Sequence, residues 1–168
     1  MKWQGIAYRA HDPRWSWAPL SGEGARLHGG RFNPKGRAAL YLALTIEGMF
    51  LEMGHGFGHR LDPVTVVSYA IDMDGLVDLR TESARRDAGV TFDDMAASWM
   101  LDRAEGREPA SWTIARRLIA TGATGALVPS FANGGYGQMA NLVLWNWSKG
   151  VEVIDPQRRL PQNPSSWE

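Results

Sequence analysis

Cysteine is absent from the 168 residues of this chain. That absence excludes a disulfide-stapled scaffold and every zinc site that depends on thiolate ligands. The chain also lacks an excess of charge of one sign, since 18 lysines and arginines balance 18 aspartates and glutamates. A protein whose main partner is nucleic acid usually carries an excess of basic residues. The balance therefore argues against direct binding of nucleic acid.

Long hydrophobic runs are missing as well, because the most apolar stretches fall far short of the roughly 20 residues that span a bilayer. The first residues, Met1-Lys2-Trp3-Gln4-Gly5, carry no apolar run of signal-peptide length. We therefore expect a cytoplasmic protein with no membrane association. Hydrophobic residues make up 44% of the chain, which argues against intrinsic disorder.

The order of the expected elements predicts an α+β fold, in one domain over residues 1–168. Glycine and proline make residues 11–37 loop-like, and residues 155–168 resemble a Pro-rich tail. Helical spacing appears after Thr45, over 92–104, and from Ser111, the expected cap, to Gly122. Strands are expected at 38–44, 64–72, 125–129, 141–147 and 150–154. These elements do not alternate in a regular βαβ rhythm, which favours α+β over α/β.

The helix after Thr45 combines an apolar stripe with one acidic residue beside it. At roughly 100° per residue, Glu52 lies well off the stripe. The stripe is expected to pack on the core, and three glycines are expected to end the helix. The stripe is Ile46, Met49, Phe50 and Met53, and the glycines are Gly54, Gly56 and Gly58.

The most unusual segment is Gly29-Gly30-Arg31-Phe32-Asn33-Pro34-Lys35-Gly36. Two glycines let the backbone approach a ligand closely, and the planar guanidinium of Arg31 suits a phosphate or carboxylate. The same residues also fit an ordinary turn with a surface arginine. The residues alone leave both interpretations open.

Other candidate residues have equally plain structural explanations. Glu52 fits an exposed glutamate, Tyr41 a half-buried core tyrosine, and Ser130 a turn residue. No Gly-x-Ser-x-Gly segment surrounds Ser130, so a hydrolase triad is poorly supported. His55 and His59 are four residues apart, but the glycines between them and the lack of a nearby carboxylate argue against a metal site.

Taken together, these segments resemble the RES-domain family over about residues 6–160. The aromatic Phe32 stands where the family more often has Trp, and Trp145-Asn146-Trp147 replaces an Asn-Pro pair. The matching segments are Tyr8-Arg9, the run from Gly24 to Gly36, Tyr41, Glu52, Ala126-Leu127-Val128-Pro129-Ser130, Asn141-Leu142-Val143-Leu144-Trp145-Asn146, Asp155-Pro156 and Arg159-Leu160.

The resemblance implies an ADP-ribosyltransferase-like fold, with split mixed β-sheets flanked by helices. It also implies the toxin of a type II toxin–antitoxin pair that consumes NAD as a substrate, with no metal. The family's functional residues correspond to Arg9, Arg31, Tyr41, Glu52 and Ser130 in this sequence, and Asn141 joins them as an NAD-binding residue.

The chemistry of these residue types fits that implication. Arginines neutralise phosphates, and an aromatic ring such as Tyr41 can stack on nicotinamide or ribose. A carboxylate such as Glu52 stabilises the positive charge that develops when the nicotinamide–ribose bond breaks. Nicotinamide is cationic in NAD and leaves neutral, so a second carboxylate is not required. Ser130 can orient Glu52 or the nicotinamide amide by hydrogen bonding.

The acceptor of ADP-ribose stays open between water, phosphate and a protein side chain. Arginine-modifying relatives of the fold carry a second glutamate at the position of Phe50, so arginine is disfavoured as the acceptor. The resemblance also implies a helical, DNA-binding antitoxin that covers the NAD cleft, with Trp15 and Trp17 as candidate anchors. The alternative is a non-catalytic module that binds carbohydrate or protein through its tryptophans, including Trp167.

Overall fold

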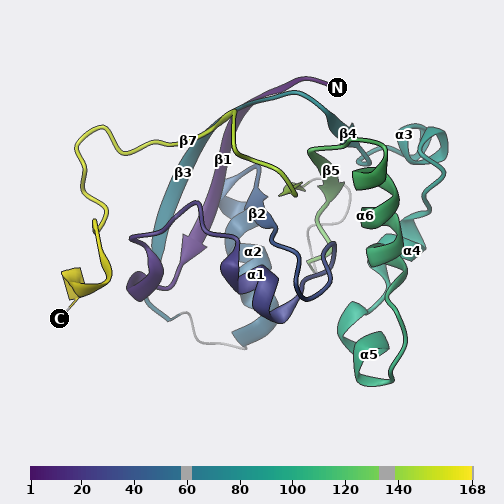
Figure 1. The fold of residues 1–168 in the computed structure, drawn as a ribbon, viewed down its shortest axis with the longest axis horizontal. Helices are drawn as coiled ribbons and strands as arrows, with labels where there is room; N and C mark the ends of the chain where they lie inside the picture. Colours follow the sequence, from purple (N-terminus) through teal and green to yellow (C-terminus); the bar gives the residue numbers. More distant parts are fainter. Residues whose placement is uncertain (58–61, 133–138, 168) are drawn as a thin grey trace.

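The computed structural model describes residues 1–57, 62–132 and 139–167. Its strands are β1 (Trp3–His11), β2 (Leu40–Ala43), β3 (Thr65–Met73), β4 (Leu76–Asp78), β5 (Gly125–Pro129), β6 (Ala140–Leu144) and β7 (Val151–Val153). Its α-helices are α1 (Glu23–His28), α2 (Ile46–Phe57), α3 (Glu82–Asp87), α4 (Phe92–Ala96), α5 (Trp99–Ala104) and α6 (Ala110–Ala120), with 3-10 turns at Pro13–Trp15 and Pro164–Trp167. Helices α3 to α6 gather at one side of the molecule and the C-terminal segment lies at the other (Figure 1). The expected α+β class is confirmed.

The described strands form one seven-stranded sheet in the order β4-β5-β6-β2-β1-β3-β7. Only β4 and β5 run parallel among the paired strands. Strands β1 and β3 pair along the whole of β1, whereas β1 and β2 share the single registered pair Tyr8↔Ala43. We call this junction the seam. The expected split sheets are therefore the two halves of one sheet, joined at the seam.

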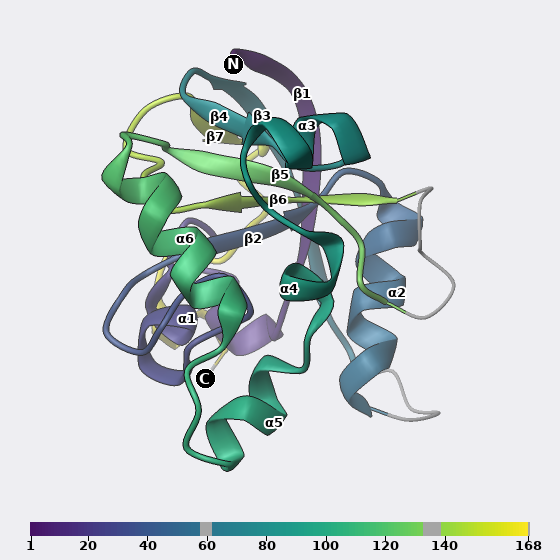
Figure 2. The same cartoon turned by 90° about the vertical axis from the view of Figure 1, so that its right-hand side faces the viewer.

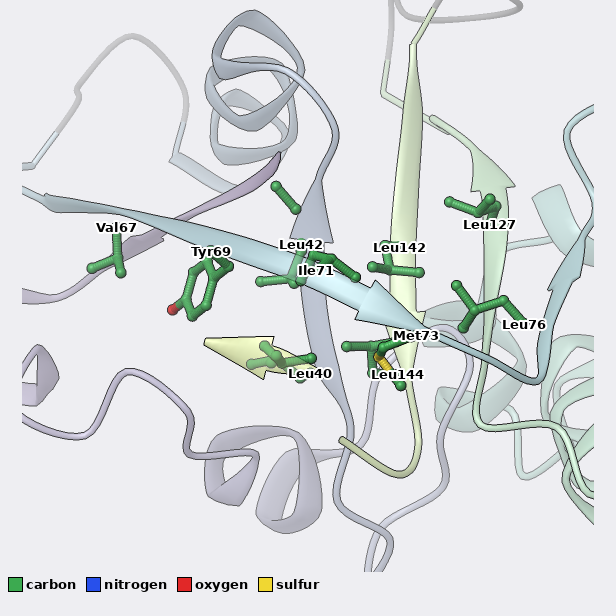
Figure 3. Packing of buried hydrophobic residues seen from close by; sticks show 12 residues of the cluster. Leu40, Leu42, Val67, Tyr69, Ile71, Met73, Leu76, Leu127, Leu142 and Leu144 are labelled. Carbon is green, nitrogen blue, oxygen red and sulfur yellow. The ribbon is translucent and has the colours of Figure 1, made fainter. Parts of the chain in front are cut away.

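Buried side chains cover both faces of the sheet, because successive residues of a strand point to opposite sides. On β5, Leu127 joins one cluster while Ala126 and Val128 join the other. Figure 3 shows the first cluster, in which leucines of β2 and β6 lie next to residues of β3. The second cluster packs α4 and α6 against β5 and β6. A sheet packed on both sides is a rigid support for the side chains that it carries.

Helix α2 begins as expected, because the Thr45 hydroxyl accepts a hydrogen bond from the Gly48 amide at 3.0 Å. It continues through Gly54 and Gly56 to Phe57, so the prediction that these glycines end the helix is wrong. A glycine inside a helix costs only about 1 kcal/mol, and α2 packs on both β1 and β2. Gly58 lies outside the described residues.

The expected apolar stripe of α2 is only half right. Met49 is buried and Met53 is half-buried, but Ile46 and Phe50 are 44% and 41% exposed. The helix instead turns Gly48 towards the sheet, where an added Cβ would lie 3.6 Å from the Met139 sulfur. Tertiary packing thus rotates α2 away from the orientation that its apolar stripe favours.

Residues 92–104 form two helices rather than one. Ala97 has an extended ψ of 147°, and the Ser98 hydroxyl then caps α5 by accepting from the Leu101 amide. Helix α6 begins after Pro109, so Ser111 is not its cap. The strand expected at 141–147 ends at Leu144, because the amides of Trp145 and Asn146 both turn to the Thr124 carbonyl. The nine-residue strand β1 and the short elements α1, α3 and β4 were not expected.

The C-terminal segment after β7 is held in part by hydrogen bonds and packing, although its prolines predict a loose tail. The Asp155 carboxylate accepts hydrogen bonds from the amides of Arg159 and Leu160 at 2.8 and 2.9 Å. These bonds lower the pKa of Asp155 and turn the chain so that Leu160 packs on the first cluster. Within the described ranges, no helix combines the length and apolarity that crossing a membrane requires.

Candidate active site

A cavity of about 610 Å³ opens where the two halves of the sheet meet. Its walls come from β1, β2, α1 and the loop that follows α1, together with α2, α5 and β6. The side chains that matter below are Arg9, Arg31, Tyr41, Glu52, Trp99, Met100, Phe131 and Asn141, all of which line it. Segments distant in the sequence thus meet around one space.

The Glu52 carboxylate is fixed through one of its two oxygens. Its Oε1 accepts hydrogen bonds from the Ser130 hydroxyl and from the Asn141 side-chain amide, each at 2.7 Å. The described part of the chain offers no hydrogen bond to Oε2. Two donors on one oxygen orient the carboxylate and leave the other oxygen available to a ligand in the cavity.

Ser130 is buried beside the cavity and contacts Glu52. The residue has no exposed surface, and it follows directly after β5. Its Oγ accepts from the Ala132 amide at 3.2 Å, while its proton is donated to Glu52. Its own amide donates to the Met139 carbonyl at 2.8 Å. A buried hydroxyl committed in this way is a positioning group, not a nucleophile.

The loop after α1 comes so close to β2 that only glycine fits at residue 30. A Cβ on Gly30 would lie 2.7 Å from both the Tyr41 hydroxyl and the Asn33 side-chain oxygen. Gly29 before it has a φ of 75°, in the left-handed region that favours glycine. The two glycines were expected to let the backbone approach a ligand; in the structure the close approach at Gly30 is to Tyr41 and Asn33, and the approach to a ligand stays a prediction.

The Tyr41 hydroxyl supports this loop instead of pointing into the cavity. It donates to Asn33 Oδ1 at 2.7 Å and accepts from the Phe32 amide at 2.9 Å. Burial raises the pKa of Tyr41, so the hydroxyl keeps its proton. The ring still lines the cavity, which is compatible with stacking on a ligand.

Side chains from α6 and the end of β6 hold three consecutive carbonyls of the same loop. Trp112 donates to Gly30 O at 2.8 Å, Ser111 donates to Arg31 O, and Trp145 donates to Phe32 O at 2.9 Å. Buried carbonyls that are all satisfied make a rigid loop. The sequence did not indicate that Trp112, Ser111 and Trp145 support this loop. The high number of tryptophans was a signal that some of them have specific roles.

Asn33 is a further residue that supports the loop, and the sequence did not indicate this role. It is fully buried, and its side-chain amide donates to the carbonyls of Ala25, Pro34 and Arg37 at 2.8 to 3.2 Å. Together with its bond to Tyr41, this makes Asn33 the hub of the loop. An asparagine between two turns of a glycine-rich segment is the local signal for such a role.

Arg31 lies in the cavity wall with part of its guanidinium already engaged. Its Nη1 donates to the carbonyls of Met95 and Ala97 at 2.9 and 2.8 Å. The guanidinium carbon also sits 4.6 Å from the centre of the Phe131 ring, a favourable cation–π distance. Arg31 therefore joins the loop to the segment that leads into α5.

Arg9 brings a second guanidinium to the cavity from β1. Its Nη1 donates to the Ser21 carbonyl at 3.3 Å, and no carboxylate of the described residues forms an ion pair with it. Burial lowers the pKa of Arg9, but an arginine stays protonated in proteins. A positive charge without a carboxylate partner suits an anionic ligand.

The structure shows where the predicted site residues lie relative to the cavity. Arg9, Arg31, Tyr41, Glu52 and Asn141 surround one cavity, and Ser130 adjoins it through Glu52. Their roles in catalysis or binding stay predictions. The described residues contain no cluster of metal-ligating side chains; His59 and the side chain of His55 lie outside them.

The tryptophans offer little to a separate aromatic binding surface. Trp3 and Trp147 pack against the first cluster, Trp145 is buried in the second, and Trp112 holds the loop. Trp17 is half-buried and Trp15 is 61% exposed. The side chain of Trp167 lies outside the described residues. Four of the eight tryptophans thus have structural roles within the fold.

Comparison with known proteins gives one family and one fold. The RES domain model matches residues 6–163. A chain from the crystal structure of the M. tuberculosis MbcT-MbcA toxin-antitoxin complex is similar in fold, with a TM-score of 0.59 at 24% sequence identity. The alignment covers 92% of this chain and 84% of the other. No curated protein matches the sequence.

Proposed function

The chain belongs to the RES-domain family, and from that premise we propose that it is the toxin of a toxin–antitoxin pair that breaks the nicotinamide–ribose bond of NAD. The observation that carries the proposal is the Glu52 carboxylate in the cavity wall, held by Ser130 and Asn141. A carboxylate oriented in this way is preorganised to stabilise positive charge on a ribose.

The cavity fits a dinucleotide in size and in charge. Its volume of about 610 Å³ lies within the usual 300–1,000 Å³ of small-molecule sites. Arg9 supplies a positive charge for a pyrophosphate, and Arg31 adds another in the same wall. The ring of Tyr41 offers a flat surface for nicotinamide or its ribose.

The proposed reaction breaks the bond between ribose C1 and the nicotinamide nitrogen. The bonding electrons go to that nitrogen, so the cationic ring leaves as neutral nicotinamide and needs no proton. Glu52 stabilises the positive charge that develops on the ribose, as the carboxylates of glycosidases do. Ser130 and Asn141 keep the carboxylate at the required position, and the rigid loop keeps Tyr41 in place.

A nucleophile completes the reaction by forming a new bond to ribose C1. Water yields ADP-ribose, phosphate yields ADP-ribose 1-phosphate, and a protein side chain yields ADP-ribosylated protein. Phe50 occupies the position of the second glutamate that arginine modification requires, and it is 41% exposed on α2. Arginine is therefore disfavoured as the acceptor, and product analysis with and without phosphate separates the other acceptors.

The test compares nicotinamide release by the wild type, Glu52→Gln and Glu47→Gln. Glutamine at 52 keeps an oxygen for Ser130 and Asn141 but removes the charge, so we expect release to fall about 10²- to 10³-fold. Glu47 lies in the first turn of the same helix, outside the cavity lining, and its variant should keep the wild-type rate. Wild-type release by folded Glu52→Gln would overturn the proposed mechanism.

The antitoxin is proposed to be a helical, DNA-binding protein that covers the cavity in the cytoplasm. The similar chain comes from a toxin-antitoxin complex, and apolar side chains are exposed on this protein, including Trp15 at 61% and Leu27 at 52%. Large exposed apolar residues are typical anchors of protein interfaces. Co-expression should restore growth, and the purified complex should release no nicotinamide. Rescue with undiminished release would contradict a covered cavity.

A further inference from the structure

The cavity has an apolar side that the proposed cleavage does not use. Trp99 and Met100 line it from α5, and Met100 is 65% exposed. Neither residue belongs to the two hydrophobic clusters. In both views α5 lies at one extremity of the molecule, beyond the sheet (Figures 1 and 2). Large apolar side chains exposed at the mouth of a cavity mark a binding surface.

Two arginines hold α5 in position against the rest of the protein. Arg31 bonds the Met95 and Ala97 carbonyls just before the helix. Arg103, within the helix, donates to the His28 carbonyl at 3.0 Å. Its guanidinium carbon lies 5.8 Å from the centre of the Trp99 ring and 5.7 Å from that of Trp112. The Trp99 ring is therefore fixed before any ligand arrives, which lowers the entropic cost of binding.

A dinucleotide places different demands on the two ends of its site. The nicotinamide ribose must lie at Glu52, and the pyrophosphate requires cations such as Arg9. The second base is a flat aromatic ring, for which an indole and a thioether are suitable partners. Met49 and Met53 share a helix with Glu52, and Phe131 is covered by Arg31. Tyr8 also lines the cavity, on β1 directly before Arg9 and so at the end proposed for the pyrophosphate. Away from Glu52 and Arg9, Trp99 and Met100 are the large apolar residues of the lining that suit the second base.

We infer that Trp99 and Met100 form the subsite for the adenine base of NAD. The inference rests on the proposed function and adds the residues that bind the unreactive half of the substrate. Recognition by stacking does not depend on the hydrogen-bonding edge of a base. The subsite should therefore accept hypoxanthine in place of adenine with a similar KM.

The experiment measures the affinity of AMP, which carries the adenine without the reacting bond, by calorimetry. Wild-type protein should bind AMP, and Trp99→Ala should weaken binding at least tenfold. Trp99→Phe, which keeps an aromatic ring, should restore most of the affinity. The matched control is Leu101→Ala, because Leu101 is 53% exposed on the same helix and does not line the cavity; it should bind AMP as the wild type does.

A second readout is the KM for NAD, which should rise in Trp99→Ala while kcat stays close to that of the wild type. Wild-type protein that binds no AMP, or Trp99→Ala that binds it normally, would overturn the subsite. Equal losses in Trp99→Ala and Leu101→Ala would also overturn it, since they would indicate damage to α5 alone. If AMP binds as expected but no NAD is cleaved, the subsite stands and the proposed cleavage fails.

Discussion

The cavity has two walls of different chemistry: one is polar and hydrogen-bonded, and the other is apolar. The polar wall consists of Glu52 with Ser130 and Asn141, and of the loop that Asn33 and Tyr41 hold. The α5 wall consists of Trp99 and Met100 on a short helix outside both hydrophobic clusters. In the first wall, hydrogen bonds between side chains orient the groups. The comparison suggests that the reacting groups need fixed geometry, whereas a base needs only an apolar surface.

The largest effect should come from breaking the hub of the polar wall. Asn33→Ala removes three donations to carbonyls and leaves the buried Tyr41 hydroxyl without its acceptor. Unsatisfied buried groups cost about 1–3 kcal/mol each, so we expect the free energy of unfolding to fall by about 3–5 kcal/mol. Urea unfolding measures it. Asn146→Ala is the control, since Asn146 is exposed; a similar loss there would contradict the special role of Asn33.

A change of pH should alter the free energy of unfolding by a comparable amount, through His11, which lies near Arg9 on β1. Buried His11 lies 2.7 Å from the Tyr69 hydroxyl, which itself donates to the Pro19 carbonyl. Burial, with the nearby Arg9 charge, lowers the pKa of His11 from 6.5 to about 4. Between these pH values the unfolded chain binds a proton that the folded chain does not, so stability falls as the pH falls from 6.5 to 4. The loss approaches about 3 kcal/mol.

The measurement is urea unfolding of wild type and His11→Gln at pH 7 and pH 4. Glutamine keeps a donor for Tyr69 but does not titrate, so the variant should lose less stability on acidification. Identical pH profiles would show that His11 does not contribute to the acid sensitivity of the fold.

A smaller effect, on kcat and KM, should distinguish Ser130 from Asn141, the two residues that orient Glu52. Ser130→Ala removes a hydrogen bond to a charged group, worth about 1.5–3 kcal/mol, so kcat for nicotinamide release should fall at least tenfold. KM should change little, because Ser130 is fully buried. Asn141→Ala should alter both constants, because Asn141 also lines the cavity. A rise in KM as large in Ser130→Ala would contradict the difference.

The smallest change in the free energy of unfolding should come from a substitution on helix α5, which carries the α5 wall. Leu101→Ala should change the free energy of unfolding by less than about 0.5 kcal/mol, since surface substitutions away from special features rarely do more. Thermal unfolding provides the measurement. A loss similar to that of Asn33→Ala would remove the contrast between the walls.

Short-range patterns predicted the fold class and several elements well. The Thr45 cap and the strand over 64–72 were found because their signals are local. The orientation of α2 was wrong for Ile46 and Phe50, because the surface below the helix decides it. The break at Ala97 was missed, since apolar spacing continues across it.

The candidate site residues and the hydrogen bond from Ser130 to Glu52 were predicted, but most of the other contacts around the site were not. The family resemblance supplied Glu52, Ser130 and Asn141, and the structure brings them within hydrogen-bonding distance. The bond from Trp145 to Phe32 joins residues 113 positions apart. No periodicity within a window of a helix or strand contains such a pair. The hydrogen bonds from Arg31 to the Met95 and Ala97 carbonyls, just before α5, could not be predicted for the same reason.

The seam has a mechanical consequence for the molecule. A single registered pair, Tyr8↔Ala43, joins two halves that are otherwise well bonded within themselves. Each backbone hydrogen bond contributes only about 1 kcal/mol net, so a change in the angle between the halves costs less here than at any fully paired junction. Helix α2 packs on both β1 and β2 and carries Glu52. The carboxylate thus lies beside the junction that has the fewest registered pairs in the described sheet, and α2 bridges that junction.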